Sequence, residues 1–445
     1  MSKLGEITAS KVDQTKLSGD GEFVYVDISS IDNQSKRIAD PKSLPFASAP
    51  SRARQLLRKG DVLVSMTRPN LNAVAIVPPD LDGAIGSTGF HVLRANDGVE
   101  PHWIYYAVQS SGFVKAMCDL VQGALYPAVR PKNIREYSID VPPLSEQRRI
   151  VAEIEKQFSR LDEAIVNLQR VKANLKRYKA SILKAAVEGR LVETEASIAQ
   201  RDGRSYETGE QLLQRILEER RAKWSGKGKY KEPLLPVTDG LPVLPEGRTW
   251  ARLDSLAALK GGITVDSKRV DPSSRSVPYL RVANVQRGLI ELTEVKQINA
   301  SPADIEELRL KHGDVLFNEG GDRDKLGRGW IWEDQLDDCI HQNHVFRARM
   351  YLGAMSPKLV SWWGNTFGKD YFLRVGKQTT NLASINLGKL SEFPVPVPPR
   401  EEQLRMVQEI ERLLSIVEGV EGNVDANLQR AQALRQAMLL KAFAL

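Results

Sequence analysis

Two long stretches of this chain, one central and one at the end, can each form a single helix, and they constrain the fold more than any other feature. The first follows Val141-Pro142-Pro143-Leu144 and contains no proline or glycine until Gly189. Ser145, with Glu146 and Gln147 after it, is a candidate helix N-cap. The stretch therefore predicts one long helix within residues 142–191.

The apolar residues of this helix recur in alternating steps of four and three, the pattern with which helices pair in a coiled coil. We call this stripe the first seam. It consists of Ile154, Phe158, Leu161, Ile165, Leu168, Leu175 and Ile182. Lys172 and Lys179 interrupt it.

The same pattern occurs again at the end of the chain. Val397–Gln403 repeats Val141–Gln147 at an offset of 256 residues. The second seam consists of Val407, Ile410, Leu414, Val417, Val424 and Leu428, and Glu421 and Arg435 interrupt it. We predict that the two helices bury their seams against each other within one molecule, as an antiparallel coiled coil. In the alternative, each seam packs on its own globular domain, although a helix of about 44 residues is roughly 66 Å long and exceeds a small domain.

The two regions between these helices have the mixed pattern of α/β domains. In residues 1–141, Phe23–Val26 and Asp61–Val64 predict strands, and Pro101–Met117 predicts a helix. In residues 248–397, strands are predicted at Val277–Leu280, Gly313–Leu316 and His344–Arg347, with a helix around Trp362, Trp363 and Phe367. We therefore expect two α/β domains, each followed by a long helix (142–191 and 398–445), with a pseudo-two-fold internal repeat.

A connector at 192–247 separates the first helix from the second domain. Gly209–Trp224 predicts a short basic amphipathic helix, and the Gly/Lys and Pro-rich residues after it predict an extended linker. Its basic residues could contact phosphates or could simply be solvated.

Composition restricts the class of protein only broadly. The chain of 445 residues has a net charge of +7, which fits a polyanionic partner but does not require one. Its start has no signal sequence and no apolar run is long enough to cross a membrane, so a cytoplasmic location is expected. Only Cys118 and Cys339 are present, and we expect structural thiols rather than a disulfide or a zinc cluster.

Familiar catalytic motifs are missing from the sequence. It contains no phosphate-binding loop, nucleophile elbow or His-Glu-x-x-His zinc helix, and no Asn/Asp-Pro-Pro-Tyr/Phe segment of amino-methyltransferases. His341 and His344 lie near Cys339 without partners at a recognised metal spacing, so structural histidines are expected and no metal site is predicted.

Polar loops in both domains supply side chains suited to nucleic acid. Arg pairs with guanine, Asn or Gln pairs with adenine, and Lys, Ser and Thr hold phosphates. For each single side chain a solvated role is the alternative. The candidates in the first domain are Thr67, Arg68, Asn70, Asn72, Arg130, Lys132 and Asn133. Those in the second are Asn318, Arg323, Lys325, Arg328, Lys377, Gln378, Thr379, Thr380 and Asn381.

With its two Val-Pro-Pro-x-x-Glu-Gln openings and the long helices ending in Leu-Lys-Ala, the chain resembles the specificity subunits of type I DNA restriction–modification enzymes. The segments Gly60–Leu63, Gly313–Leu316 and Gln342–Arg347 also resemble that family. The Leu-Pro-x-Gly-Trp motif that is common in the family appears here only in the second half, in an altered form at Leu244–Trp250. The first half starts abruptly at Leu4.

The resemblance implies a non-catalytic subunit that binds double-stranded DNA at a bipartite asymmetric target. Each domain would recognise one half-site, and the helices would fix the spacing between the halves. It also implies two methyltransferase subunits, which bring S-adenosylmethionine, and restriction–translocase subunits, which bring ATP and magnesium, so no cofactor is expected on this chain. The rival interpretations are a coiled-coil scaffold that binds only proteins and, third, an enzyme.

Overall fold

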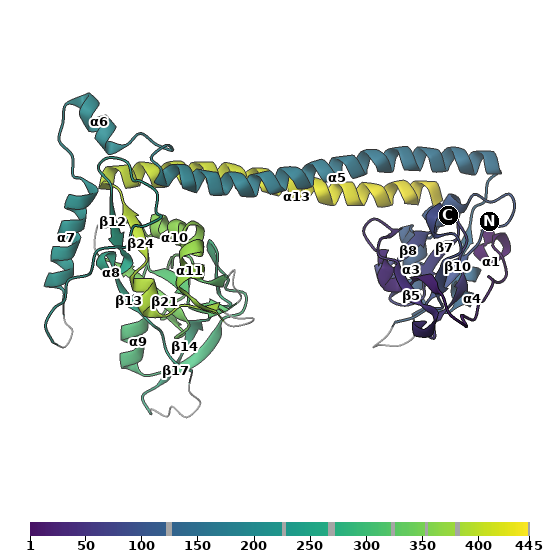
Figure 1. The fold of residues 1–445 in the computed structure, drawn as a ribbon, viewed down its shortest axis with the longest axis horizontal. Helices are drawn as coiled ribbons and strands as arrows, with labels where there is room; N and C mark the ends of the chain where they lie inside the picture. The colour runs from purple at the N-terminus through teal and green to yellow at the C-terminus, as the bar shows by residue number, and fades with distance from the viewer. Residues whose placement is uncertain are drawn as a thin grey trace. The chain divides into compact units, whose positions relative to one another are not determined.

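The computed structural model describes residues 1–121, 127–224, 228–265, 272–321, 325–351, 355–378 and 383–443. The chain divides into two compact units, Met1–Lys172 with Gly422–Leu445, and Ala173–Glu421. Each unit contains a mixed α/β domain and a section of two long helices, α5 (Leu144–Val187) and α13 (Arg400–Phe443), coloured teal and yellow in Figure 1. The predicted fold class is confirmed.

Two small sheets form the first domain, with strand orders β5-β2-β9-β6 and β10-β7-β8. All neighbouring strands are antiparallel except β2 and β9. The strands are β2 (Glu22–Val26), β5 (Lys42–Pro45), β6 (Ala53–Leu56), β7 (Val62–Ser65), β8 (Val74–Ile76), β9 (Ile85–Ser87) and β10 (Phe90–Leu93). Two further antiparallel pairs are β1 (Ser2–Lys3) with β11 (Ser138–Ile139), and β3 (Ile31–Asp32) with β4 (Arg37–Ile38).

Short helices cover these sheets, namely α1 (Leu4–Ile7), α2 (Pro101–Ala107), α3 (Ser111–Asp119) and α4 (Pro131–Glu136). The prediction of one helix over Pro101–Met117 is wrong. Ser110 interrupts it, because its side chain accepts a hydrogen bond from the Phe113 amide (3.3 Å) and caps a new helix.

In the described ranges of the second domain there are three three-stranded sheets, with orders β17-β14-β20, β13-β21-β18 and β19-β23-β22. Antiparallel pairs β12–β24 and β15–β16 complete it. Its strands are β12 (Thr249–Arg252), β13 (Ala257–Lys260), β14 (Arg275–Leu280), β15 (Val285–Gln286), β16 (Leu289–Ile290), β17 (Lys296–Ala300), β18 (Val315–Asn318), β19 (Gly320–Gly321), β20 (Ile340–His341), β21 (Val345–Met350), β22 (Lys377–Gln378), β23 (Ala383–Ser384) and β24 (Pro394–Val397). Its helices are α8 (Leu253–Leu256), α9 (Pro302–Leu308), α10 (Pro357–Thr366), α11 (Gly368–Val375) and α12 (Leu387–Ser391).

The described part of the connector contains two helices, of which the second was predicted. They are α6 (Glu195–Asp202) and α7 (Gly209–Ala222). Leu212 and Ile216 of α7 are buried in the core of the second unit. Basic residues of α7 bond within the chain, Arg215 to Glu207 and Arg220 to the Asp254 carbonyl. The structure therefore gives this helix a packing role.

Both long helices begin with the same local structure. The Gln147 side chain accepts from the Glu100 amide (2.9 Å) and donates to the Pro142 carbonyl (2.8 Å). Gln403 likewise accepts from the Ser356 amide (2.9 Å) and donates to the Pro398 carbonyl (3.0 Å). The glutamine of the repeated Val-Pro-Pro-x-x-Glu-Gln opening thus ties the helix to its own domain. The helix itself begins at Leu144, one residue before the predicted cap Ser145.

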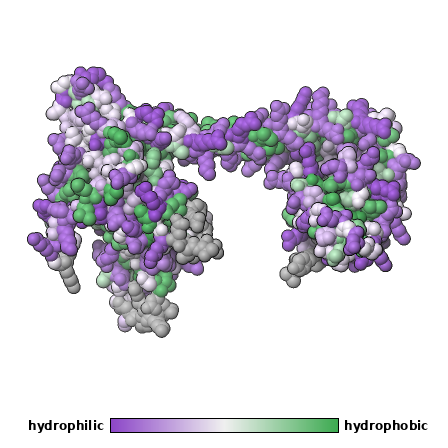
Figure 2. Space-filling view, viewed as in Figure 1, coloured by the Kyte–Doolittle hydropathy of each residue, from purple (hydrophilic) through white to green (hydrophobic). Residues whose placement is uncertain are grey.

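Within each unit the two helices run antiparallel, and their apolar seams pack against each other. All thirteen predicted seam residues are buried or half-buried. Five of the buried ones also join a domain core: Ile154 and Phe158 in the first unit, and Ile182, Ile410 and Val417 in the second. Hydrophilic residues predominate on the outer surface of the helices in Figure 2. The predicted pairing is correct, and the alternative of packing on the domain holds near the helix ends.

The polar residues in the seams are paired across the two helices. In the first unit, Lys172 bonds to Asp425 (2.6 Å), and Arg435 bonds to Asp162 (2.9 Å) and lies over the Phe158 ring (4.3 Å). In the second unit, Lys179 bonds to Glu421 (2.8 Å). These pairs hold the helices in one register.

Candidate nucleic-acid interface

In the first domain, the two predicted loops lie against each other. The Arg68 amide donates to the Pro127 carbonyl and the Val129 amide to the Met66 carbonyl, both at 2.8 Å. Thr67 and Ala128 form an antiparallel bridge. The structure therefore brings the loop after β7 and the segment before α4 together, which their composition did not predict.

The 67–72 loop, which we define as Thr67–Asn72, has an unusual backbone. A short 3₁₀ turn, Pro69–Leu71, lies between Arg68 (φ 49°) and Asn72 (φ 45°), both in the left-handed region. Asn tolerates this conformation, whereas for Arg it costs about 1–2 kcal/mol. Thr67, Arg68 and Asn70 are exposed. The strain thus accompanies a side chain that faces solvent and is available for contact.

The second candidate segment of this domain is partly used in capping. The Arg130 amide donates to the Asn133 side chain (2.9 Å), so the Asn133 oxygen holds the start of α4. The Lys132 side chain is 79% exposed and lies 3.6 Å from Glu136. Such an exposed pair contributes little to stability and leaves the ammonium accessible.

The second domain repeats the loop arrangement with other residues. The Ile385 amide donates to the Glu319 carbonyl (2.8 Å), as Val129 does to Met66. β23 pairs with both β19 and β22, and so joins Gly320–Gly321 to Lys377–Gln378. A Cβ on Gly320 would lie 2.7 Å from the Ala383 carbonyl oxygen, so this close approach requires glycine. Arg323, Thr379, Thr380 and Asn381 lie outside the described residues, as does the side chain of Gln378.

Two predicted contact residues of this domain have structural roles instead. Asn318 is fully buried, and its amide donates to the Val285 carbonyl (2.8 Å). The Arg328 guanidinium donates to the Val282 carbonyl (3.3 Å). Both side chains hold the backbone at the start of β15 and before it, and full burial keeps the Asn318 side chain from contacting bases. Lys325 is half-buried and Lys377 is exposed.

Sequence reasoning missed a cleft beside these loops. It has a volume of about 520 Å³ and is lined by Glu319, His344, Lys377 and Ser384, together with apolar and glycine residues. The Glu319 carboxylate contacts Nδ1 of His344. The sequence signal for this cleft is Glu319. It directly follows β18, at the position that Met66 occupies after β7 in the first domain. A carboxylate can accept from the amino group of cytosine, which makes this cleft compatible with base contacts.

A repeated ion pair fixes the strands that carry both loops. Arg94 donates through Nε and Nη2 to Asp61, both at 2.8 Å, and Asp61 also accepts from the Arg58 amide. In the second domain, Arg349 makes the same two bonds to Asp314 at 2.8 and 2.7 Å, and the Lys311 amide completes the set. Each aspartate side chain is 1% exposed. These bidentate bonds explain the Gly-Asp-Val-Leu repeat, whose aspartate has a buried partner.

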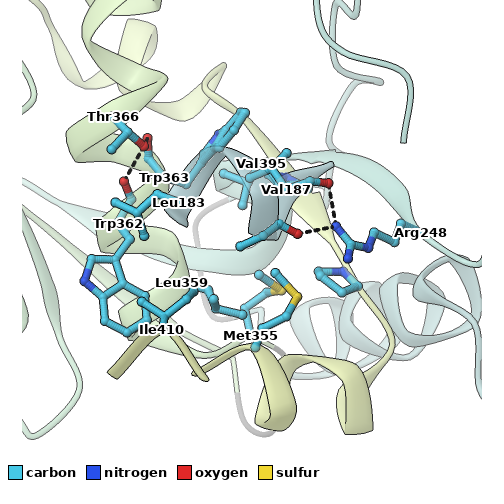
Figure 3. A pocket seen from close by; sticks show the side chains of 14 residues that line it. Leu183, Val187, Arg248, Met355, Leu359, Trp362, Trp363, Thr366, Val395 and Ile410 are labelled. Atoms are coloured by element: carbon cyan, nitrogen blue, oxygen red, sulfur yellow. Dashed lines mark hydrogen bonds between the residues drawn. The ribbon is translucent and has the colours of Figure 1, made fainter. Parts of the chain in front are cut away.

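The end of α5 is held by Arg248, which Figure 3 shows bonded to the last residues of the helix and which also forms a buried ion pair with Glu402. Arg248 donates through Nη1 to the carbonyls of Ala186 (2.9 Å) and Val187 (2.6 Å), and its Nε donates to Glu402 (2.6 Å). Glu402 also accepts from the Glu195 amide (2.7 Å). The two charged side chains are 0% exposed. The guanidinium therefore satisfies the last carbonyls of one long helix and the first-turn carboxylate of the other.

Beside this ion pair lies a small apolar cavity of about 30 Å³, lined among others by Met355, Trp362 and Trp363. It has room for about two waters and no organic ligand. Within the described ranges, no three His, Cys, Asp or Glu side chains gather as a metal site. Among the same residues, no helix is long and apolar enough to span a membrane. Cys339 is buried and Cys118 half-buried, and burial raises the pKa of the Cys339 thiol to about 12.

Comparison with known proteins points in one direction. Residues 1–176 match the family model described as the type I restriction modification DNA specificity domain. The specificity subunit of the type I restriction enzyme EcoKI from Escherichia coli K12 is 21% identical over 354 residues, covering 79% of this chain and 67% of that protein. The StySPI specificity subunit of Salmonella potsdam is 22% identical over 358 residues, covering 79% of this chain and 66% of that protein. The chain thus matches about two thirds of the length of these relatives.

A solved structure agrees over nearly the whole chain. It comes from work on the complex assembly and conformational transition of the type I R-M system, and its chain is 26% identical to this one with a TM-score of 0.69. The match covers 99% of this chain and 96% of that one.

Proposed function

Because the chain belongs to the family of type I restriction–modification specificity subunits, we propose that it binds DNA sequence-specifically at a bipartite target, with one half-site for each domain. The observation that carries this proposal is the duplicated loop pair: 66–72 against 127–129 in the first domain, and 319–321 against 383–385 in the second. Each pair places polar loops on a strand fixed by the same buried Asp–Arg bonds.

The paired helices would set the distance between half-sites. Two recognition units on a rigid spacer bind together only where separation and helical phase on the DNA both match. Binding of the second unit then becomes intramolecular, which raises affinity and excludes single half-sites. The polar pairs within the seams support a spacer of fixed register.

We further propose that this chain is non-catalytic, and that methyltransferase subunits with S-adenosylmethionine and restriction subunits with ATP and magnesium supply the chemistry. The scaffold alternative is less favoured, because the relatives are named specificity subunits of restriction enzymes. The salt dependence of DNA binding distinguishes the DNA-binding proposal from the scaffold alternative. A protein that contacts DNA phosphates loses affinity steeply with rising salt, whereas a scaffold that binds only proteins shows no DNA affinity.

Selection from a random DNA library, with the chain in complex with its methyltransferase subunits, tests the proposal. We expect a motif of two short specific blocks separated by a fixed number of unspecified base pairs. Enrichment of one continuous block would contradict the assignment of one half-site to each domain.

Single substitutions then assign the half-sites. We expect Arg68→Ala to relax one block and Lys377→Ala to weaken the binding of the other, with a loss of about 1–3 kcal/mol for a base contact. Arg170, exposed on α5 in the first unit, is the matched control, and Arg170→Ala should leave the motif unchanged. If both loop variants keep the wild-type motif and affinity, these side chains do not contact DNA.

A further inference from the structure

Lys36 lies at the tip of the β3–β4 hairpin and reaches across to the 67–72 loop. Its Nζ donates to the Asn72 carbonyl (2.5 Å) and lies 3.5 Å from the Leu71 carbonyl. The hairpin tip is a tight turn, with Lys36 at φ 56° and its amide bonded to the Asp32 carbonyl (2.8 Å). The ammonium is therefore committed to the end of the loop rather than to solvent.

The backbone of Lys36 is itself fixed. The Tyr105 hydroxyl on α2 donates to the Lys36 carbonyl (2.8 Å), and the Tyr105 side chain lies in the core of the first unit. The ring thus anchors the hairpin tip to a buried helix. Lys36 forms a link from α2, through the hairpin, to the loop.

This link complements the bonds on the other side of the loop. Arg68, near the start of the loop, and Met66, just before the loop, are bonded to residues 127–129. Asn72, at its end, bonds through its amide to Pro69 within the loop (3.0 Å), and through its carbonyl to Lys36. A charge-assisted bond to a carbonyl at the end of a strained turn is well placed to hold that turn.

We propose that Lys36 is a positioning residue that sets the conformation of the 67–72 loop, and with it the specificity for the first domain's half-site, without contacting DNA. This inference rests on the proposed function. It goes beyond it by assigning specificity to a side chain behind the recognition surface.

The surroundings of Lys36 make the link sensitive to pH. Burial lowers the pKa of its ammonium to about 8, repulsion from Arg435 on α13 adds to this, and Asp32 opposes it. The neutral amine that forms above that pH makes a weaker bond to the Asn72 carbonyl. The other titratable or charged groups facing this region line the neighbouring cavity: Arg37 on β4, His102, Tyr105 and Tyr106 on α2, and Glu155 and Asp162 on α5.

The second domain offers an internal control. Its β15–β16 hairpin has Arg287 at the corresponding tip, and Arg287 donates to the Asn365 carbonyl on α10. The neighbouring Gly288 amide bonds to the Gly329 carbonyl (3.2 Å). Changes at Lys36 should therefore affect one half-site and leave the other unaffected.

The experiment measures methylation by the assembled complex on DNA libraries that vary each half-site separately, at pH 7 and at pH 9. We expect Lys36→Met to reduce discrimination at one half-site about tenfold at pH 7 and to leave the other half-site and the spacing unchanged. Wild type should lose the same discrimination at pH 9. Lys36→Arg, which stays charged, should retain discrimination at both pH values. Lys16→Met is the control, since Lys16 is an exposed lysine of the same domain.

Tyr105→Phe provides a second variant if Lys36→Met folds poorly, because it removes only the hydroxyl bond to the Lys36 carbonyl. It should affect the same half-site more weakly. Unchanged discrimination in Lys36→Met and Tyr105→Phe would overturn the inference, and so would an equal loss at both half-sites, which indicates general destabilisation. A wild-type complex without a bipartite motif would instead refute the proposed function.

Discussion

The ion pair between Arg248 and Glu402 allows the sharpest test of the folded structure. In Arg248→Met, a side chain of similar length keeps the apolar packing but removes the guanidinium. Glu402 then remains as a buried charge whose remaining partner, among the described residues, is the Glu195 amide, and the Ala186 and Val187 carbonyls lose their donor. Breaking a buried pair in this way costs about 3–5 kcal/mol.

Replacing both partners with apolar residues should cost less. In Arg248→Met with Glu402→Leu no buried charge is left, although the two carbonyls still lose their donor. We therefore expect the double variant to be more stable than Arg248→Met alone. The matched control is Arg412→Met on α13, where the Arg412 side chain is 60% exposed and its Glu409 partner 30% exposed, and no measurable change is expected.

Urea unfolding of the full chain, followed by tryptophan fluorescence, measures these differences. Of the seven tryptophans, only Trp103 lies in the first unit, so the signal reports mainly on the second. A loss below 1 kcal/mol in Arg248→Met would refute the reasoning. A double variant as unstable as the sum of the two single changes would also refute it, because the charges would then be uncoupled.

Two further predictions concern acid stability and spacing. Burial lowers the pKa of His341 to about 4, so its neutral form stabilises the second domain above pH 6.5, and about 3 kcal/mol is lost as the pH falls towards 4. Unfolding measured against pH should show this loss in wild type and in His312→Gln, an exposed control, but not in His341→Asn; an equal loss in all three would contradict it. Deleting Leu168–Asn174 from α5 and Gly422–Leu428 from α13 removes one heptad from each helix, about 10 Å, and should shorten the gap between half-sites by about three base pairs or abolish binding. An unaltered gap in the methylated motif would mean that the helices do not set the spacing.

The long helices and their pairing could be predicted because the information is local and periodic. Apolar residues at heptad spacing have one economical burial, and the duplicated Val-Pro-Pro opening identified two helices of the same kind. The break at Ser110 was missed because the apolar spacing continues across it. The sequence did not predict α6, because the Gly, Lys and Pro residues later in the 192–247 connector favour an extended linker.

The loops show where sequence alone is insufficient. That the 67–72 and 127–133 segments would both be exposed followed from their polarity, and the structure brings them together. Asn318 and Arg328 have the same residue types but point inwards, because the β15 turn offers them buried carbonyls. Whether a polar side chain faces solvent or forms an internal hydrogen bond depends on its neighbours in the folded domain. The residue type alone does not specify those neighbours.

The polar pairs across the seams also limit how the two long helices can be misaligned. If α13 slipped by one heptad, Lys179 would face Leu414 or Leu428 instead of Glu421, and a half-buried ammonium would lose its partner. Apolar contacts alone would tolerate such a slip, since one leucine resembles the next. The charges turn a repeating pattern into one with a single low-energy alignment, so they disfavour misaligned pairing of the two helices during folding.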